Sequence, residues 1–436
     1  MNTRLDWRSS AGRPLRGSVQ VPGDKSISHR ALMLAAIAEG SSRIRDFLEG
    51  EDTRATAAVL AQLGVRIDAP ARGERIVHGV GLHGLRGSTR PLDCGNAGTG
   101  MRLLAGLLAG QAFESVLVGD ASLSKRPMRR VSDPLTQMGA RIDSRDGTPP
   151  LRLHGGSMLR GIRYELPMAS AQVKSGVLLA GLYAQGATEV IEPHPTRDYT
   201  ERMLAAFGWP IEFEPGRARL DGGHRLHAID IDVPADFSSA AFFLVAASIV
   251  PGSELCLPAV GLNPRRTGLL QALRLMGADI TVQRQREAGG EPMGDLLVRH
   301  APLHGIELPT ELVPDLIDEL PVLFVAAAGA VGRTVIRGAA ELRVKESDRI
   351  ATMATGLRAL GVAIDETPDG AIIDGGPIGT GTVESLTDHR IAMSFAVAGL
   401  LATGPVRIND CRHVATSFPG FRELANGCGF ALEDGD

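Results

Sequence analysis

The chain has 436 residues and a formal net charge of −4, with 44% hydrophobic and 22% charged residues. This composition is typical of a soluble globular protein with more than one core, and its slightly acidic balance does not favour general nucleic-acid binding. The N-terminal residues lack the apolar core of a secretion signal, and the longest apolar runs are too short to span a bilayer. Cys94, Cys256, Cys411 and Cys428 lie far apart, which indicates reduced thiols of a cytoplasmic protein.

The stretch from Val21 to Gly40 predicts a helix whose N-terminus attracts an anion. Pro22-Gly23 is a turn signal, and hydroxyl and basic residues follow it immediately before an apolar run. A helix start attracts anions through its free N–H groups and its dipole, and Lys25 and Arg30 would strengthen that attraction. Taken alone, the stretch fits an ordinary capped helix with solvated basic residues equally well.

The pattern of this stretch recurs along the chain. Polar residues followed by an apolar helix that ends in Gly return about every seventy residues, a period that predicts a module of several elements. The stretches of this first kind are 25–40, 96–110, 170–186, 236–252, 315–332 and 388–404. A second helix follows in each module, and a Gly closes it before a short β-branched segment begins. These second stretches are 51–68, 126–143, 196–212, 263–280, 343–365 and 418–433.

The six modules divide into three plus three. We therefore expect one domain over residues 23–235 and a second over residues 236–436, joined by the N-terminal segment 1–22. The chain would cross between the two domains near Pro22–Gly23 and near Pro234–Asp236, an arrangement that suits a hinge. Each module is predicted to contain two helices and several short strands, which places the protein in the α/β class.

Charged and amide residues gather at the expected helix starts of the first half. Residues 94–100, Cys-Gly-Asn-Ala-Gly-Thr-Gly, form a glycine-rich turn whose N–H groups could approach an oxyanion, although a plain tight turn is the commoner interpretation. Ser124–Arg130 packs four cations around a Pro at a helix start, which is unfavourable unless an anion binds there. A solvated basic loop is the alternative for this segment.

The second half contributes acids as well as bases. Asp318 and Glu319 stand before a very apolar helix, Glu341–Arg349 alternates both signs of charge, and Arg390 stands at another helix entrance. A salt-bridged helix face is the usual interpretation of such alternation. Carboxylates among anion-binding cations would weaken simple binding, so their presence favours proton transfer with pKa values set by the cations. No spacing of His, Cys and Asp indicates a metal site.

Eight motifs in order resemble the family of 5-enolpyruvylshikimate-3-phosphate (EPSP) synthases over essentially the whole chain. They are PGDKSISHRAL, CGNAGTGMRLL, KRPM, SAQVK, LIDELP, LRVKESDR, TDHRIAM and ATSFPGF. The resemblance implies a two-lobed inside-out α/β barrel, the enolpyruvyl transferase fold, with three βαβαββ repeats in each lobe and closure over the substrates. It also implies transfer of the enolpyruvyl group of phosphoenolpyruvate to the 5-hydroxyl of shikimate 3-phosphate, through a tetrahedral intermediate, with release of phosphate. We expect these two small molecules as partners, a monomer, and no cofactor.

The resemblance further implies a role for individual residues. Asp318 would be the base for the attacking hydroxyl, Glu346 would protonate the methylene carbon and later remove that proton, and Lys25 would assist at the departing phosphate. The residues implied to bind shikimate 3-phosphate are Lys25, Ser26, Arg30, Ser170, Ala171, Gln172, Arg197, Asp318, Glu341 and Lys345. Those implied to bind phosphoenolpyruvate are Lys25, Asn96, Gly98, Arg126, Gln172, Arg349 and Arg390.

Several positions depart from other branches of the family. Ala171 stands where some relatives carry a second Ser, and Glu341 replaces an Asn. Thr416 stands where some members have a Lys for phosphoenolpyruvate, which puts that contact in doubt. The combination resembles the branch that contains glyphosate-tolerant enzymes, in which the position of Gly98 is often Ala. Because this chain has Gly98, we expect it to be glyphosate-sensitive or intermediate.

Two other functions remain open at this point. UDP-N-acetylglucosamine enolpyruvyl transferase has the same fold, but that family uses a loop Cys near the glycine-rich region, and residues 112–130 contain none. A non-catalytic, two-lobed anion-binding protein would account for the cations. Asp318 and Glu346 argue against such a binder, since acids have no use in a site that only holds anions.

Overall fold

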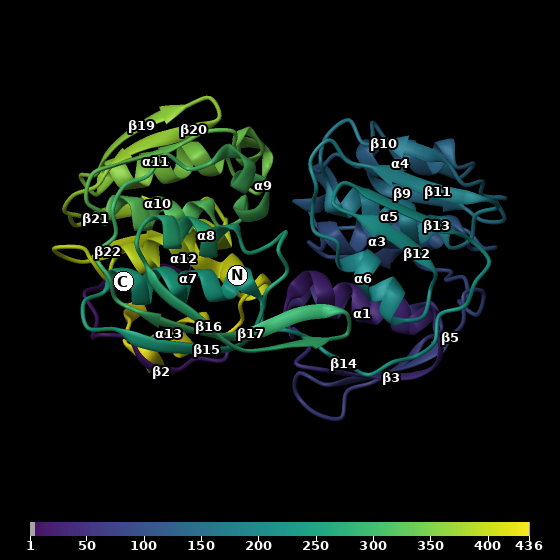
Figure 1. Ribbon diagram of the computed structural model, residues 1–436. Helices are drawn as coiled ribbons and strands as arrows, with labels where there is room; N and C mark the ends of the chain where they lie inside the picture. Colours follow the sequence, from purple (N-terminus) through teal and green to yellow (C-terminus); the bar gives the residue numbers. More distant parts are fainter. Residues whose placement is uncertain (1–4, 436) are drawn as a thin grey trace. The chain divides into compact units, whose positions relative to one another are not determined.

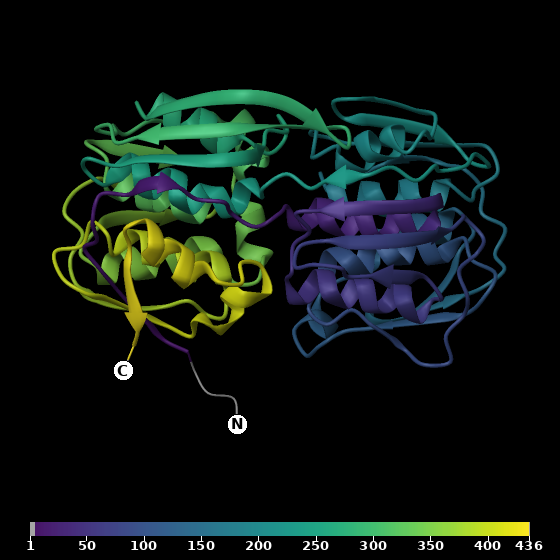
Figure 2. The same ribbon diagram turned by 90° about the horizontal axis from the view of Figure 1, so that it is seen from below.

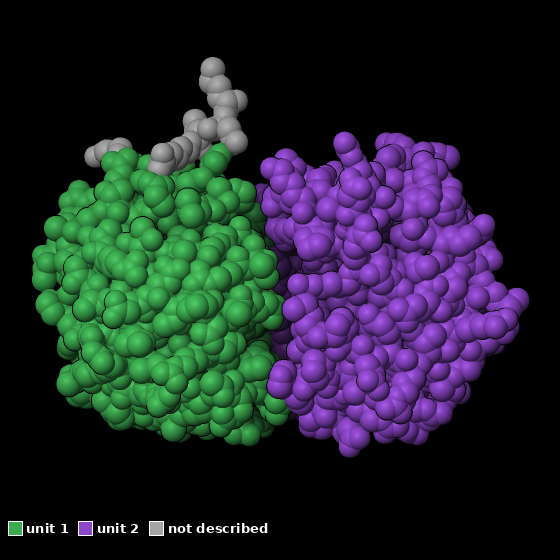
Figure 3. Space-filling view, turned by 90° about the horizontal axis from the view of Figure 1, so that it is seen from above, with its two compact units in different colours: residues 1–22, 235–286, 292–436 green, residues 23–234, 287–291 purple. Residues whose placement is uncertain are grey.

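The computed structural model describes residues 5–435. Residues 1–4 and 436, which the predicted second domain includes, lie outside the described residues. The chain divides into two compact units (Figure 3). Unit 1 comprises Met1–Pro22, Ala235–Arg286 and Pro292–Asp436, and unit 2 comprises Gly23–Pro234 and Glu287–Glu291. Each unit has a hydrophobic core of its own.

Unit 2 contains three pairs of helices, and the first helix of each pair is buried nearly all round. In α1, for example, every residue from Ile27 to Ile37 is buried. The close contact of α3 with α5 requires glycine, since a Cβ on Gly106 would lie 2.0 Å from the backbone oxygen of Gly176. The six helices (Figure 1) are α1 (Lys25–Ile37), α2 (Glu51–Gln62), α3 (Gly98–Ala109), α4 (Arg129–Gln137), α5 (Ala171–Gly181) and α6 (Tyr199–Ala206).

Three four-stranded sheets pack against these helices (Figure 2) and share one plan. Their strand orders are β14-β3-β5-β4, β6-β7-β9-β8 and β10-β11-β13-β12. In each sheet the first two strands are parallel and the other neighbours are antiparallel. The strands are β3 (Glu39–Arg45), β4 (Arg66–Asp68), β5 (Arg75–Val80), β6 (Leu92–Asp93), β7 (Ser115–Val118), β8 (Arg141–Arg145), β9 (Thr148–His154), β10 (Arg163–Glu165), β11 (Ala187–Ile191), β12 (Ile211–Glu214), β13 (Arg217–Asp221) and β14 (Ile231–Asp232).

Unit 1 follows a similar plan, although one of its described sheets has only three strands, and it takes strands from both ends of the chain. Its sheets have the orders β16-β17-β15-β2, β18-β20-β19 and β21-β22-β1-β23, so the N-terminal strands β1 and β2 complete two of them. The strands are β1 (Trp7–Ser10), β2 (Arg16–Ser18), β15 (Glu254–Gly261), β16 (Asp279–Ala288), β17 (Glu291–Arg299), β18 (Arg333–Ile336), β19 (Ala363–Thr367), β20 (Gly370–Asp374), β21 (Gly381–Glu384), β22 (Val406–Asn409) and β23 (Ala431–Asp434).

In unit 1, the apolar helix that the sequence predicts after Asp318 and Glu319 begins at Leu320. The helices are α7 (Phe237–Ile249), α8 (Gly268–Leu275), α9 (Val313–Leu316), α10 (Leu320–Ala328), α11 (Arg349–Ala359), α12 (His389–Ala398) and α13 (Phe421–Cys428). The stretch 315–332 contains a break between α9 and α10, and Pro321, which has no N–H to donate, fits the first turn of the new helix. The break leaves Asp318 and Glu319 at the N-terminus of α10.

The predicted α/β class with six βαβαββ-type repeats is confirmed. The sheets formed by residues 5–435 are open, so the barrel character lies in the placement of buried helices behind outer sheets rather than in a closed ring of strands. Over the same range, no helix is both long and apolar enough to cross a membrane.

Candidate functional site

The N-terminus of α1 carries the first of the predicted site residues. The carboxylate of Asp24 caps the helix by accepting the backbone N–H of Ile27 at 2.8 Å. Lys25, in the first turn, places its Nζ 2.6 Å from Oδ2 of Asp52 in α2. A cation at a helix start opposes the helix dipole, and Asp52 compensates for this. Ser26, also in this turn, is half-buried.

Arg30 is buried one turn further along α1, with 3% of its surface exposed. Its guanidinium donates to the hydroxyls of Thr200 and Ser175, each at 2.7 Å, and to the backbone oxygen of Ser26 at 2.9 Å. Burial, reinforced by the positive charge of Arg197, lowers the pKa of Arg30 to about 10, so the group stays protonated near neutral pH. Arg30 therefore links α1, α5 and α6 through its own hydrogen bonds.

A second group of predicted residues meets at the N-terminus of α3. Nη2 of Arg126 donates to Oδ1 of Asn96 at 2.6 Å, and Asn96 in turn donates to Asp120 at 2.7 Å. Gly98 begins the helix and leaves room for two guanidinium groups. A Cβ at Gly98 would lie 3.0 Å from Nη1 of Arg126 and 3.3 Å from Nη1 of Arg102. A larger residue here would press directly on Arg126.

Gln172, in the first turn of α5, connects this group to the next helix. Its Oε1 accepts from Arg102 at 2.7 Å, and its Nε2 donates to the hydroxyl of Thr99 at 2.9 Å. The hydroxyl of Ser170 caps α5 by accepting a backbone N–H at 3.4 Å. Ala171 can offer a ligand only its backbone, as expected for a residue without a hydroxyl. The N-termini of α3 and α5 thus lie side by side.

The loop that carries Arg197 is held by a buried ion cluster. Nζ of Lys174 lies 2.7 Å from Glu192 and 2.7 Å from Glu201, and no side chain of the three is more than 3% exposed. Glu192 also accepts from the backbone N–H and the hydroxyl of Thr196, next to Arg197. Burial raises the pKa of Glu201 in spite of the neighbouring ammonium group. The cluster fixes the start of α6 against α5.

In unit 1, the break before α10 places Asp318 among three cations. Its Oδ2 lies 3.1 Å from Nη1 of Arg266, while its Oδ1 lies 3.6 Å from Nη1 of Arg349 and 3.8 Å from Nζ of Lys345. Lys345 also donates to Glu341 at 2.7 Å. Cations at these distances interact more favourably with a carboxylate than with a carboxylic acid.

Arg349 is buried at the start of α11, where it joins two acids. Its Nε donates to Oδ2 of Asp388 at 2.8 Å, and its Nη2 donates to Oε2 of Glu346 at 2.7 Å. Burial alone would lower the pKa of Arg349, but Asp388 and Glu346 outweigh it, so this pKa lies above its usual range. The side chain of Glu346 remains 33% exposed. A solvent-accessible carboxylate therefore stands beside a fixed cation.

Glu319 connects the N-termini of three helices in unit 1. Its carboxylate, in a residue only 1% exposed, accepts from the hydroxyl of Ser238 in α7 and lies 3.4 Å from Nη1 of Arg266. The same Oε1 lies 3.4 Å from Nη1 of Arg390, in the first turn of α12. Arg390 also donates to the backbone oxygen of Asp318 at 3.1 Å. The helices α7, α10 and α12 consequently start close together.

Within each unit, the structure brings predicted site residues into hydrogen-bonded groups. Unit 2 joins Asn96 to Arg126, and Arg30 to the backbone of Ser26. Unit 1 joins Asp318 to the groups that hold Glu346 and Glu341. The hydroxyl of Thr416 is used locally, since it donates to the backbone oxygen of His413 at 2.7 Å.

Two contacts of these groups were not predicted from the sequence. Asp52 follows Glu51 in the first turn of α2, and an acidic first turn is an ordinary feature of helices. Arg266 belongs to an Arg-Arg pair just before α8. That pair is the only signal for its role, and it resembles the basic helix starts of the first half.

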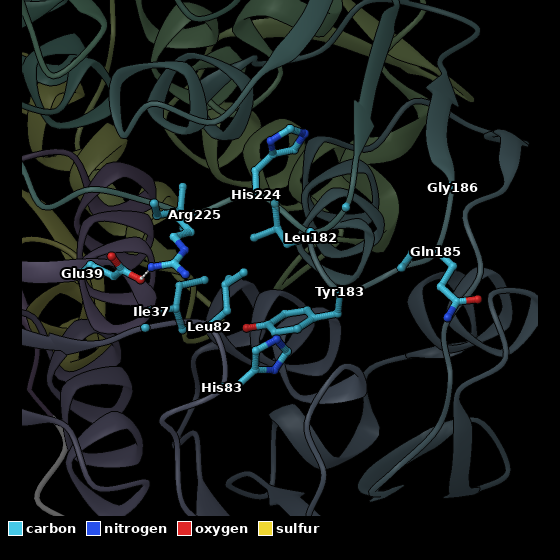
Figure 4. A pocket seen from close by; sticks show the side chains of 15 residues that line it. Ile37, Glu39, Leu82, His83, Leu182, Tyr183, Gln185, Gly186, His224 and Arg225 are labelled. Atoms are coloured by element: carbon cyan, nitrogen blue, oxygen red, sulfur yellow. Dashed lines mark hydrogen bonds and ion pairs between the residues drawn. The ribbon is translucent and has the colours of Figure 1, made fainter.

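A pocket of about 740 Å³ lies elsewhere in unit 2 (Figure 4). Ile37, the last residue of α1, and Leu182, just after α5, line it together with the ion pair of Arg225 and Glu39 at 2.9 Å. None of the predicted site residues lines this pocket. Since α1 begins at Lys25 and has 13 residues, about 20 Å of helix separates the pocket from the basic N-terminus.

The sequence matches the EPSP synthase (3-phosphoshikimate 1-carboxyvinyltransferase) family over residues 10–424. The chain belongs to this family. It is 68% identical over 432 residues to the 3-phosphoshikimate 1-carboxyvinyltransferase of Xanthomonas campestris pv. campestris, with 99% of each chain covered. It is 69% identical over 428 residues to the enzyme of the same name from Xanthomonas euvesicatoria pv. vesicatoria, with 98% of this chain and 97% of the relative covered.

Solved structures agree with this assignment. An EPSP synthase from Acinetobacter baumannii superposes with a TM-score of 0.92 at 52% identity and covers 100% of both chains. The enolpyruvyl transferase NikO from Streptomyces tendae superposes with a TM-score of 0.81 at 19% identity over 99% of each chain, which shows the shared fold. The protein is an enolpyruvyl transferase, as the motifs implied. Neither UDP-N-acetylglucosamine enolpyruvyl transferase nor a non-catalytic binder is favoured.

Proposed function

We propose that the residue groups described above serve the reaction of the EPSP synthase family. In that reaction the enolpyruvyl group of phosphoenolpyruvate passes to the 5-hydroxyl of shikimate 3-phosphate, and inorganic phosphate is released. The observation that carries the proposal is the position of the Asp318 carboxylate within 4 Å of three cations. Both substrates are anions, so a carboxylate among their binding cations weakens binding unless it accepts a proton.

Shikimate 3-phosphate is proposed to bind at basic helix starts. The free N–H groups of α1 and α5 suit a phosphate, and the buried Arg30 is already oriented by its own hydrogen bonds. The proposed contacts are Lys25, Ser26, Arg30, Ser170, Ala171, Gln172, Arg197, Asp318, Glu341 and Lys345. The Lys174 cluster supports this assignment, because it fixes the loop that carries Arg197.

Phosphoenolpyruvate is proposed to bind to arginine guanidinium groups. Arg126 is held by Asn96, and Arg349 and Arg390 are held by acids, so each guanidinium reaches its orientation without a ligand. Planar guanidinium groups suit the carboxylate and phosphate of this substrate. The proposed contacts are Lys25, Asn96, Gly98, Arg126, Gln172, Arg349 and Arg390.

The proposed chemistry uses three protein groups for proton transfer. Asp318 takes the proton of the attacking hydroxyl as its oxygen bonds to the central carbon of phosphoenolpyruvate, and Glu346 gives a proton to the methylene carbon. The resulting tetrahedral intermediate then loses phosphate when its C–O bond breaks and Glu346 recovers the proton from the methyl group. Lys25 supplies positive charge and a proton to the departing phosphate. The fixed cations orient both reactants and stabilise the charge that develops.

The test is a phosphate-release assay with the two substrates supplied together and separately. Wild type should release phosphate only when both are present, and Asp318→Asn should lower kcat by at least about a hundredfold while still binding shikimate 3-phosphate. Asp374→Asn, which removes an exposed partner of Arg333 in the same unit, is the matched control. Loss of less than tenfold in Asp318→Asn would exclude Asp318 as the base. Absence of release by wild type would refute the proposed reaction.

The remaining proposals concern the state of the enzyme and its inhibition. We propose a monomer that works in the cytoplasm on small molecules, without nucleic-acid or membrane partners, and the four free cysteines support a reducing compartment. Light scattering of the purified enzyme tests the monomer. We also propose sensitivity or intermediate sensitivity to glyphosate, because Gly98 adds no methyl group beside Arg126.

A further inference from the structure

We propose that Arg266 is a positioning residue that fixes the carboxylate of Asp318 and, through Glu319, the guanidinium of Arg390. The inference rests on the proposed role of Asp318 as the base. Nη1 of Arg266 lies 3.1 Å from Oδ2 of Asp318 and 3.4 Å from Oε1 of Glu319. One guanidinium nitrogen therefore contacts two consecutive acids at the start of α10, and the second of them contacts Arg390.

Arg266 is itself held firmly. Its side chain is 7% exposed, its Nη2 donates to the hydroxyl of Ser238, and the same nitrogen lies 3.9 Å from Oδ1 of Asp236. Asp236 caps α7 by accepting the backbone N–H groups of Ser238 and Ser239. The backbone of Arg266 donates to the oxygen of Asn263 in the turn before α8. The guanidinium is thus fixed to two helix starts and has little freedom to move.

The two oxygens of Asp318 face different partners, and this assigns them different tasks. Oδ2 accepts from Arg266, whereas Oδ1 faces Lys345 and Arg349. Lys345 and Arg349 are proposed to bind substrates, but Arg266 is not. When the substrates recruit those two cations, Arg266 remains as a partner that Asp318 retains. Oδ1 is then the oxygen directed at the substrate side, and it receives the proton.

Acids near Asp318 offset each of its cations, which matters for the charge of the carboxylate. Glu319 and Asp236 face Arg266, and Glu341 faces Lys345. Both Glu346 and Asp388 face Arg349, and Arg390 contacts the backbone of Asp318 and the side chain of Glu319. Removal of the charge on Arg266 therefore leaves Asp318 and Glu319 close together with one shared cation fewer. The ionised form of Asp318 is then less favourable, and catalysis should need a higher pH.

The experiment compares the pH dependence of kcat/KM in three variants. Arg266→Gln removes the charge, Arg266→Lys keeps the charge but not the planar fork, and Arg265→Gln is the matched control. Arg265 pairs with Asp315 at 3.3 Å instead of with Asp318, so its loss removes a neighbouring ion pair without touching the base. Thermal unfolding of each variant reports whether the fold is kept.

We expect Arg266→Gln to shift the acidic limb of the pH profile of kcat/KM to higher pH by about one unit. The same substitution should lower kcat by about ten- to a hundredfold. Arg266→Lys should lower kcat and raise the KM for phosphoenolpyruvate, while the acidic limb of its pH profile stays at the wild-type position. A folding defect alone would not produce this combination. Arg265→Gln should keep the wild-type profile. If Arg266→Gln does not fold, the Arg266→Lys result decides.

The outcomes separate this inference from the proposed reaction. If Asp318→Asn abolishes turnover while both Arg266 variants keep kcat within twofold and the acidic limb unchanged, the positioning role is overturned and the base stands. If Asp318→Asn remains active, the base assignment is wrong and the role of Arg266 falls with it. An acidic limb that moves equally in Arg265→Gln would also overturn the inference, since the effect would then belong to any nearby arginine.

Discussion

The buried pair of Arg349 and Asp388 gives the sharpest prediction for stability. Asp388 is 0% and Arg349 is 1% exposed. The carboxylate accepts from Nε of Arg349 at 2.8 Å, from its Nη2 at 3.3 Å, from the hydroxyl of Ser347 at 3.1 Å and from the backbone N–H of Arg390 at 2.9 Å. The substitution Asp388→Asn keeps the shape of the side chain but removes its charge and turns one acceptor into a donor. It therefore leaves a buried guanidinium without its main counter-charge.

The expected loss is large for one substitution. Removal of one partner from a buried ion pair costs about 3–5 kcal/mol of folding free energy, because the remaining charge stays buried. In a unit of this size, such a loss lowers Tm by about 6–20 °C. Differential scanning calorimetry at pH 7 measures the change. The KM for phosphoenolpyruvate should rise as well, since Asp388 orients Arg349.

The dependence on pH follows from the direction of the pKa shift of Asp388. Burial alone would raise this pKa, but Arg349 and His389 lower it further than burial raises it. A carboxylate with a lowered pKa in the folded state stabilises the fold at pH values above its unfolded pKa of about 4. This stabilisation is lost as the pH falls through the lowered folded value. The Tm difference between wild type and Asp388→Asn should thus be constant from pH 6 to 8 and shrink below about pH 4.

Asp374→Asn is the control for this experiment. Asp374 pairs with Arg333 at 2.7 Å, but both side chains are largely exposed, so solvent screens the pair and Tm should hardly change. If Asp388→Asn lowers Tm by less than about 2 °C at pH 7, the argument from burial is contradicted. So would a Tm difference that stays the same from pH 5 to pH 3.

Three further predictions use other parts of the molecule. Gly98→Ala should displace Arg126 and raise the KM for phosphoenolpyruvate by about threefold or more. It should also raise the glyphosate concentration needed for half-inhibition. Unchanged inhibition would contradict the proposal that glyphosate binds beside Gly98. Lys174→Met leaves two buried glutamates without their cation and should cost about 3–5 kcal/mol, which amide substitutions at both glutamates should largely restore in thermal unfolding. Burial raises the pKa of Cys94 and of Cys428 to about 12 each, so a thiol reagent at pH 8 should label them only after unfolding, as mass spectrometry can show.

The fold class could be predicted because each repeat has short sequence patterns that indicate its helices. Each buried helix is apolar on all sides and is preceded by polar residues, and each second helix ends at a Gly. The start of α10 could also be predicted, because Asp318 and Glu319 stand immediately before its apolar run. Pro321 was the local signal for the new helix start.

The site could be predicted only where its residues form linear motifs. Asn96, Arg126 and Arg390 stand in such motifs, and the structure shows what holds them. The partnership of Lys25 with Asp52 joins two helices of one unit, and that of Arg266 with Asp318 spans 52 positions. Such contacts depend on which helix N-termini are adjacent in the tertiary structure, and this cannot be inferred from composition or periodicity.

The helix starts themselves argue for multiply charged ligands. The helices α1, α3 and α5 have no acidic residue in their first turns, and the same holds for α10, α11 and α12. Lys25, Arg349 and Arg390 stand there instead, although a cation at a helix N-terminus is unfavourable by itself. Asp52, Asp388 and Glu319 compensate this charge within the protein. In the proposed binding mode, anionic substrates compete with these fixed acids for the cations that the acids orient.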